Sequence, residues 1–320
     1  MSRKRKQLCM TVLVLCIVLT STLIYKKYIE DKPKVIVVLM DSNLEYWNIV
    51  RAGAEKGFKD FGINGKVVAA KDGVVEEQIA LLDDILKEKP DVLIIAPGHS
   101  DTFPKLEEFY TADIPVLFIQ TDAKWDKKTA YIGTNNIELG EKEGILMASQ
   151  LQPGDKVALL GRQTMFEVDR LTGARASLEA AGIEIIAEHN QLPENNEELN
   201  EVLVKGMKSI LQEHPDLKGI VTSTDFVAIP ALKVVEEQGV DVSVMGTGGL
   251  VEMLQYVKEG IVPITISQTP YEMGYSSVET SAKVANGEEV NKEIYTAIDI
   301  VTIGNAQQRL EFYEKALEGN

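Results

Sequence analysis

The residue types that carry covalent or metal chemistry are few in this sequence, and their spacing forms no catalytic set. Both cysteines, Cys9 and Cys16, lie in an apolar N-terminal run, so the rest of the chain has no thiol nucleophile, disulfide or thiolate ligand. The three histidines (His99, His189 and His214) are far apart and include no His-x-x-x-His pair, which argues against zinc. No nucleophile is paired with a base. We therefore predict a protein that is not an enzyme and needs no cofactor.

A glycine-rich stretch and the overall charge also bear on the ligand. Residues 246–249 (Gly-Thr-Gly-Gly) resemble a phosphate cradle, but no Lys-Ser or Lys-Thr follows them, so we discount phosphate. The chain has 33 basic and 49 acidic residues, a net charge of −16. Six of the basic residues lie within 1–27, so residues 28–320 carry 27 basic and 49 acidic residues, hence −22. A surface this negative repels nucleic acid, which we exclude as a partner.

Beyond residue 33 the chain alternates between short β-branched runs and longer amphipathic stretches. The continuous apolar runs suit strands that are buried on both faces of a parallel sheet. Strands that alternate with helices over this length predict an α/β protein made of two doubly wound halves. The best candidate for a chain crossing between the halves is 132–136. The predicted strands are 35–39, 65–70, 92–96, 116–119, 130–132, 156–160, 184–188, 219–222, 242–245 and 264–266, and the main intervening helices are 47–61, 75–87, 139–151, 166–181, 197–212, 228–238 and 250–259.

The N-terminus has the pattern of a membrane anchor. Basic residues 3–6 precede an uncharged run over 8–25, which ends in Lys26-Lys27. About 18 uncharged residues are near the minimum for a helix that crosses a bilayer. No small-x-small cleavage site follows, and Leu15 replaces the small residue that precedes a lipidated cysteine. We therefore predict a single uncleaved transmembrane helix within 1–27, with the remainder outside the cytoplasm. A cleaved signal sequence is the alternative.

Seven motifs in order resemble the type I periplasmic sugar-binding proteins of the ribose-binding group. Together they span about residues 34–300, and they lie at 37–57, 114–122, 131–136 with Gly140, 170–173, 222–225, 264–270 and 284–287. The resemblance implies two Rossmann-like lobes joined by a three-crossover hinge, with the ligand in the cleft between them. It implies an N-terminal lobe of 34–134 plus 269–297 and a C-terminal lobe of 135–268 plus 298–320. The crossovers would then lie near 133–136, near Gln268 and near 298–300.

The resemblance also assigns ligand contacts in the first half, beyond the carboxyl ends of strands, where open α/β sheets bind ligands. Tyr46 and Trp47 stand where the family has an aromatic pair, whose flat faces would hold the apolar face of a sugar ring. Asn43 lies beside them and could bind hydroxyls. Asp122 stands for an acid that accepts sugar hydroxyls, and His99 follows the third strand. The alternatives are a core aromatic, a solvated turn aspartate and a solvated loop histidine.

In the second half, Arg170 aligns with a cleft arginine of the family, and we expect it to lie outside the hydrophobic core. Gln268 matches a glutamine on a crossover, where its amide can both donate and accept, although it could instead brace the hinge. Thr224 replaces an asparagine, and Asp225 aligns with an aspartate that could equally cap a helix. Gly248 stands where the family has an acid, so the ligand need not be ribose.

Three functions follow from the resemblance. The uncleaved anchor is similar to that of membrane-anchored xylose-binding regulators, which implies a sensor of a neutral monosaccharide, with the pentose D-xylose as first choice, that signals to a membrane histidine kinase. The first alternative is the binding subunit of an ABC sugar importer, whose partner would be the permease. The second is an autoinducer-2 receptor of the same fold.

Overall fold

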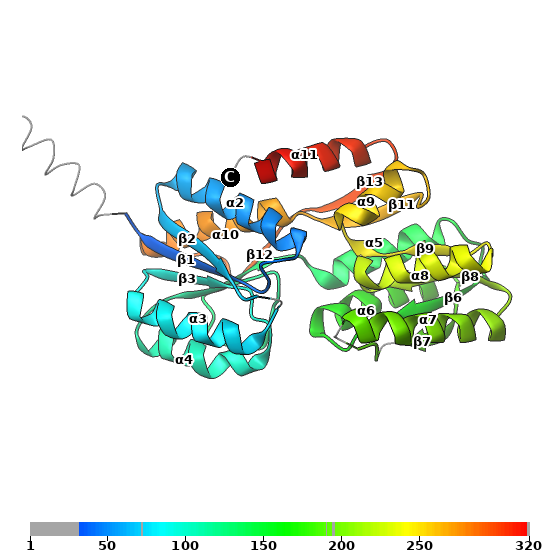
Figure 1. The fold of residues 1–320 in the computed structure, drawn as a ribbon, viewed down its shortest axis with the longest axis horizontal. Helices are drawn as coiled ribbons and strands as arrows, with labels where there is room; N and C mark the ends of the chain where they lie inside the picture. Colours follow the sequence, from blue (N-terminus) through cyan, green and yellow to red (C-terminus); the bar gives the residue numbers. More distant parts are fainter. Residues whose placement is uncertain (1–31, 72, 190, 194–195, 319–320) are drawn as a thin grey trace, which may run out of the picture.

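A six-stranded parallel sheet forms the centre of the first lobe, in the order β12-β5-β4-β3-β1-β2. The computed structural model describes residues 32–71, 73–189, 191–193 and 196–318 (Figure 1). The central strands are buried along almost their whole length because helices cover both faces. The six strands are β1 (Lys34–Leu39), β2 (Asn64–Ala69), β3 (Val92–Ile95), β4 (Val116–Ile119), β5 (Ala130–Gly133) and β12 (Glu293–Tyr295).

Two pairs of helices cover this sheet. α2 (Glu45–Phe61) and α10 (Pro270–Ala285) pack on one face, and α3 (Val75–Glu88) and α4 (Phe103–Thr111), preceded by the short turn η1 (Ser100–Thr102), pack on the other. α10 follows the segments of the second lobe in the sequence, so the first lobe is formed from two separate parts of the chain. α2 ends at Gly62, whose left-handed conformation (φ 67°) closes the helix.

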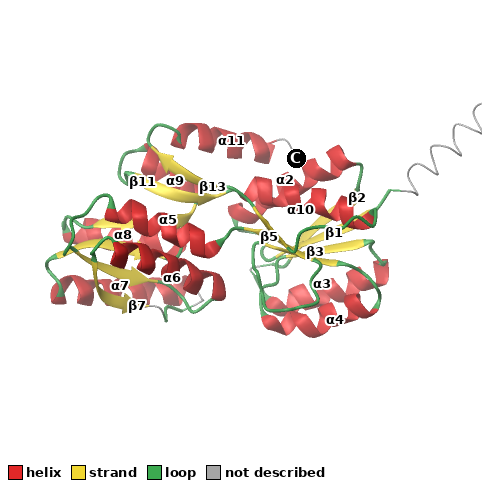
Figure 2. Ribbon diagram, turned by 180° about the vertical axis from the view of Figure 1, so that it is seen from behind, coloured by secondary structure: helices red, strands yellow, loops and turns green. Residues whose placement is uncertain are grey.

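The second lobe is built on a four-stranded parallel sheet in the order β7-β6-β8-β9. Its strands are β6 (Lys156–Leu160), β7 (Glu184–His189), β8 (Leu217–Thr222) and β9 (Ser243–Met245). α5 (Asn136–Ala148) and α6 (Met165–Ala180) cover one face, and α7 (Asn196–Glu213) and α8 (Asp225–Gln238) cover the other. Figure 2, the view from behind, shows helices on either side of the strands in both lobes.

A small third sheet, which the sequence did not predict, lies beside the second lobe. It contains β10 (Thr247–Gly248), β11 (Ile264–Gln268) and β13 (Ile298–Thr302), with β13 antiparallel to β11. α9 (Val251–Lys258) and the C-terminal helix α11 (Ala306–Glu318) pack against each other beside it. α11 also reaches α2 of the first lobe (Figure 1), and the ring of Phe312 lies 5.2 Å from that of Tyr271 on α10. The C-terminal helix therefore touches both lobes.

The chain passes between the lobes at three places. The first is between β5 and α5, the second between β11 and α10, and the third between β12 and β13. The third falls at 296–297, slightly before the expected 298–300. We propose lobes of 34–134 plus 269–297 and 135–268 plus 298–320, with the third crossover at 296–297.

Among the described residues, no helix is long and apolar enough to cross a membrane. The predicted anchor, residues 1–27, lies outside the part of the chain that the structure describes.

Glycines bring α5 and α6 into direct backbone contact. A Cβ atom on Gly140 would lie 1.8 Å from the carbonyl oxygen of Arg170, and one on Gly173 would lie 2.2 Å from that of Ile137. The two helices therefore approach closely because neither glycine has a side chain.

α5 begins at residue 136, earlier than predicted, because the side chain of Asn135 accepts a hydrogen bond from the Glu138 N–H (3.1 Å) and caps the helix.

The first lobe uses the same device between α2 and α10. A Cβ on Gly53 would lie 1.9 Å from the carbonyl oxygen of Tyr271, and one on Gly274 would lie 2.0 Å from that of Val50. α2 carries Tyr46 and Trp47 at its N-terminal end, so the glycine contact fixes the helix that presents the aromatic pair.

We predict that Gly140→Ala lowers the free energy of unfolding by about 1–3 kcal/mol, because a backbone atom of the facing helix occupies the space that the methyl group needs. Urea unfolding of the variant measures the change. Gly206→Ala is the matched control, since Gly206 lies within α7 and its added Cβ would meet no atom closer than 3.6 Å. A Gly140→Ala protein as stable as the wild type would contradict the close contact.

Candidate functional site

A cavity of about 230 Å³ lies between the two lobes, at the carboxyl ends of their parallel strands. Open α/β sheets bind ligands at this edge because the loops that follow the strands converge there. The first lobe contributes Met40, Leu44, Tyr46, Trp47 and Gln120, and the end of β11, where the chain crosses between the lobes, contributes Gln268. The second lobe contributes Arg162, Phe166, Arg170, Thr224, Asp225, Phe226, Thr247, Gly248 and Leu250.

An aromatic pair forms part of the first-lobe wall. The rings of Tyr46 and Trp47 stand edge to face, with their centroids 5.2 Å apart. Trp47 is buried and belongs to the core that joins α2 to the sheet, whereas Tyr46 is half-buried. The Tyr46 hydroxyl contacts the sulfur of Met273 at 3.8 Å, and burial raises the pKa of this phenol. The pair therefore offers a rigid, largely apolar surface to the cavity.

Arg170 is a buried arginine on the opposite wall, which corrects the expectation that it lies outside the core. Only 2% of the residue is exposed, and its side chain is hydrogen-bonded within the lobe. Nε donates to the Asn136 side-chain oxygen (2.9 Å), and Nη1 donates to the Ser223 carbonyl (3.1 Å) and the Thr247 hydroxyl (3.2 Å). The guanidinium also lies 5.0 Å from the ring centre of Phe166. Burial lowers the pKa of Arg170, and the nearby carboxylate of Glu167 opposes this shift.

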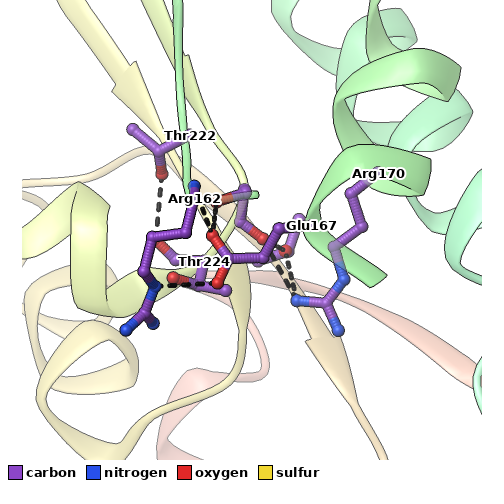
Figure 3. Close-up of polar contacts among 7 residues, drawn as sticks. Arg162, Glu167, Arg170, Thr222 and Thr224 are labelled. Carbon is purple, nitrogen blue, oxygen red and sulfur yellow. Dashed lines mark hydrogen bonds and ion pairs between the residues drawn. The ribbon is translucent and has the colours of Figure 1, made fainter. Parts of the chain in front are cut away.

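A second arginine, which the sequence analysis missed, lines the same wall. Arg162 follows β6 and forms an ion pair with Glu167, its Nε donating to Oε1 at 2.8 Å (Figure 3). Glu167 is fully buried, and its Oε2 accepts from the backbone N–H of Arg162 (2.9 Å) and from the Ser223 hydroxyl. Arg162 comes directly after Gly161 at the end of a strand, and that position was the available signal.

Among the residues that line the cavity, two oxygens are buried without a hydrogen-bond partner among the described residues. They are the Thr224 hydroxyl and Oδ1 of Asp225, both from residues that line the cavity. The other oxygen of Asp225 accepts from the N–H groups of Gly249 (2.7 Å) and Leu250 (2.8 Å), so the glycine-rich loop is bonded to a carboxylate. Burial raises the pKa of Asp225 to about 6, against the effect of these two bonds and of Arg170.

Two glutamines lie where the lobes join. Gln268 donates from Nε2 to the Thr134 hydroxyl (2.8 Å), so it links two crossovers while it also lines the cavity. Gln120 directly follows β4, with a φ of 67°, and its Oε1 accepts from the Thr121 hydroxyl (2.5 Å). Gln120 lines the cavity, whereas Asp122, the residue chosen from the sequence, does not. The position of Gln120 directly after β4 was the sequence signal that favoured Gln120 over Asp122.

The structure brings five predicted residues to the cavity and leaves three outside its lining. Tyr46, Trp47, Arg170, Thr224 and Gln268 line it. The other three, Asn43, His99 and Asp122, have polar neighbours in their own loops instead. Asn43 is exposed in the loop before α2, where its side-chain oxygen accepts from the Ser42 hydroxyl (3.5 Å).

His99 and Asp122 each have a nearby polar partner instead. The His99 ring accepts from the Asp101 N–H (3.3 Å) at the start of η1 and lies 3.2 Å from the Asp101 carboxylate. Asp122 forms an ion pair with Lys128 at 3.0 Å. Short-range pairing therefore turns both side chains toward their own loops.

Residues 35–289 match the profile of the periplasmic binding protein domain, and the chain belongs to this family. The chain is 26% identical over 265 residues to the ribose import binding protein of Bacillus subtilis, covering 81% of this chain and 84% of that protein. It is 25% identical to the ribose import binding protein of Escherichia coli, covering 84% and 90% of the two chains. The sequence resemblance to the ribose group of type I periplasmic sugar-binding proteins is thus confirmed.

Solved structures share the fold. An ABC transporter solute-binding protein from Actinobacillus succinogenes with bound D-allose has a TM-score of 0.76 at 25% identity, covering 87% of this chain and all of that one (100%). A periplasmic ribose ABC transporter structure from Conexibacter woesei has a TM-score of 0.80 at 20% identity, covering 89% and 97%. The two-lobed α/β architecture is that of a periplasmic binding protein, and the relatives are binding proteins of transporters rather than enzymes.

We predict that Arg170→Ala both weakens ligand binding at least tenfold and lowers the free energy of unfolding by about 1–3 kcal/mol, because it removes charge-assisted bonds and leaves buried acceptors unpaired. Arg170→Lys should rescue little, since an ammonium cannot reproduce the planar fork. Calorimetry and urea unfolding measure the two effects. Arg175→Ala is the control, since Arg175 is a half-buried arginine on the same helix that forms ion pairs with Glu179 and Glu188 and does not line the cavity. Normal binding by a less stable Arg170→Ala protein would mean that this arginine has only a structural role.

Asp225 predicts a pH dependence of stability. Its pKa of about 6 in the folded state exceeds that of an unfolded aspartate, so the fold holds the proton more tightly, and this stabilisation is lost as the pH rises toward and through 6. Asp225→Asn should therefore gain about 2 kcal/mol relative to the wild type between pH 4.5 and pH 7.5. Urea unfolding at both pH values tests this, with Asp241→Asn at an exposed position as control. An unchanged difference would show that burial does not raise this pKa.

Proposed function

We propose that this chain binds a neutral monosaccharide in the cavity between its lobes. The observation that carries the proposal is the combination of an aromatic surface on one wall with hydrogen-bonding groups on the other. A sugar ring has an apolar C–H face and a rim of hydroxyls, so Tyr46 and Trp47 would hold the face. The unpartnered oxygens of Thr224 and Asp225 would accept from the hydroxyls, and Arg170 would donate to them.

The balance of charge supports a neutral ligand. The cationic side chains of Arg162 and Arg170 are accompanied by the carboxylates of Glu167 and Asp225, in and directly behind the cavity wall. Asp225 is mostly ionised at neutral pH because its pKa is about 6. Glu143, buried on α5, has a pKa that burial raises well above its ordinary value. An anionic ligand would find no excess positive charge among these groups.

The names of the relatives favour a monosaccharide as the ligand. The relatives from Bacillus subtilis and Escherichia coli are named ribose import binding proteins, and one solved structure holds D-allose. D-xylose is our first choice among the pentoses, with autoinducer-2 as an alternative ligand. The two walls belong to different lobes, so a ligand that contacts both would stabilise the closed arrangement by its differential affinity for it.

Calorimetry of residues 28–320 against D-xylose, D-ribose, D-allose, D-glucose and autoinducer-2 tests the proposal. We expect at least one neutral sugar to bind with a Kd near the micromolar range, a binding free energy of about −8 kcal/mol. Glucose 6-phosphate is the anionic comparison and should bind more weakly. Absence of binding by every neutral sugar would overturn the proposal.

We further propose that a membrane protein reads the bound state. The names of the relatives favour the permease of an ABC importer as this partner. The basic residues and uncharged run within 1–27 favour a tethered chain, which keeps a membrane histidine kinase as the second candidate. A kinase gene beside this one would favour sensing, and genes for an ATPase and a permease would favour import.

The tether itself predicts the behaviour of the full chain. Expressed whole, the protein should stay in the membrane fraction, keep its N-terminal residues and resist alkaline carbonate extraction, because an uncharged helix of about 18 residues inserts into the bilayer. N-terminal sequencing and fractionation measure this. Residues 28–320 behind a cleavable signal sequence provide the control. Mature protein that begins after Tyr25 in the medium would refute the anchor.

A further inference from the structure

Glu167 is a fully buried carboxylate that does not line the cavity, yet it holds a residue that does. Oε1 accepts from the side chain of Arg162 at 2.8 Å. Oε2 accepts from the backbone N–H of the same residue at 2.9 Å and from the hydroxyl of Ser223. One side chain thus fixes both the backbone and the guanidinium of Arg162.

The same carboxylate also reaches Arg170 through one intermediate residue. The hydroxyl of Ser223 donates to Glu167, and the carbonyl oxygen of Ser223 accepts from Arg170 Nη1 at 3.1 Å and from the Thr247 hydroxyl at 2.9 Å. Figure 3 shows the guanidinium groups of Arg162 and Arg170 on opposite sides of Glu167. Both arginines line the cavity, so two ligand-facing cations share one buried anchor.

The physical reason for such an anchor is conformational entropy. An arginine side chain has many rotamers, and a ligand that must order it loses affinity for each one that it immobilises. The Arg162 side chain is only 13% exposed and is bound in its ion pair before any ligand arrives. A buried carboxylate is itself strongly unfavourable unless it is paired and hydrogen-bonded, so Glu167 in turn requires Arg162. The pair orients the cavity wall in advance.

We propose that Glu167 is a positioning residue for both arginines, and that Arg162 is a specificity-determining contact that donates to a hydroxyl or ring oxygen of the sugar. The specificity role rests on the proposed function, whereas the positioning role does not. Arg162 would distinguish epimers because its fixed guanidinium group can donate to an oxygen at one position on the sugar ring. An epimer whose oxygen lies elsewhere would leave that donor without a partner.

The first experiment is a double-mutant cycle with Glu167→Gln, Arg162→Gln and the double variant. Calorimetry with D-xylose, D-ribose and D-allose gives the affinity and the preference among the sugars. We expect Glu167→Gln to weaken the best-bound sugar about tenfold and to reduce the preference, and we expect little further loss when it is added to Arg162→Gln. Glu179→Gln, an exposed acid on the same helix, should leave binding unchanged. Additive losses, or an unchanged preference in Glu167→Gln, would overturn the proposal.

The second measurement needs no sugar. In protein labelled with ¹⁵N-arginine, the Nε–H of Arg162 should be protected from hydrogen exchange in the wild type and should exchange at least tenfold faster in Glu167→Gln, with a smaller increase for Arg170. Arg175, which is bonded to other acids, should not change. Unchanged protection in Glu167→Gln would overturn the positioning role. If no sugar binds the wild type, the proposed function and the specificity role fail together, and exchange alone decides the positioning role.

Discussion

The second-lobe wall of the cavity depends on the hydrogen bonds that the buried guanidinium of Arg170 donates. A charge removed from water is strongly unfavourable unless its donors are bonded, so the groups around it must keep their places. Those groups come from three elements: Asn136 at the start of α5, the Ser223 carbonyl after β8, and Thr247 in β10. Together they tie the four-stranded sheet, its covering helix and the small third sheet to one point at the edge of the cavity.

Helix spacing decides whether this guanidinium reaches its partners. The contact of Gly140 with the backbone of Arg170 sets the distance between α5 and α6, and thereby the distance from Arg170 to Asn136. The first lobe repeats the device, since Gly53 and Gly274 allow α2 to lie against α10. Each cavity wall is thus presented by a helix that a glycine contact holds in place. The C-terminal helix α11, which touches both α2 and α9, adds a link between the lobes behind the cavity.

The cavity combines satisfied and unsatisfied polar groups in a way that suits a ligand with many hydroxyls. The cations are bonded within the lobe, whereas the Thr224 hydroxyl and Oδ1 of Asp225 have no partner among the described residues. A buried acceptor without a partner costs about 1–3 kcal/mol, which a hydroxyl donor would recover. Aromatic rings complete the site on the other lobe. Closure would therefore be favoured by a ligand that satisfies both walls at once.

The sequence by itself determined the alternation of strands and helices, because buried β-branched runs and amphipathic stretches are local patterns. The resemblance to the sugar-binding family pointed to Tyr46, Trp47 and Arg170, because they stand at matching places in its motifs. Only the tertiary structure separated Gln120 from Asp122, revealed Arg162, and formed the third sheet of β10, β11 and β13. The physical reason is that each of these depends on partners distant in the chain or on competition between nearby charges. Local sequence sets backbone preference, but the fold chooses which hydrogen-bond partner a polar side chain meets.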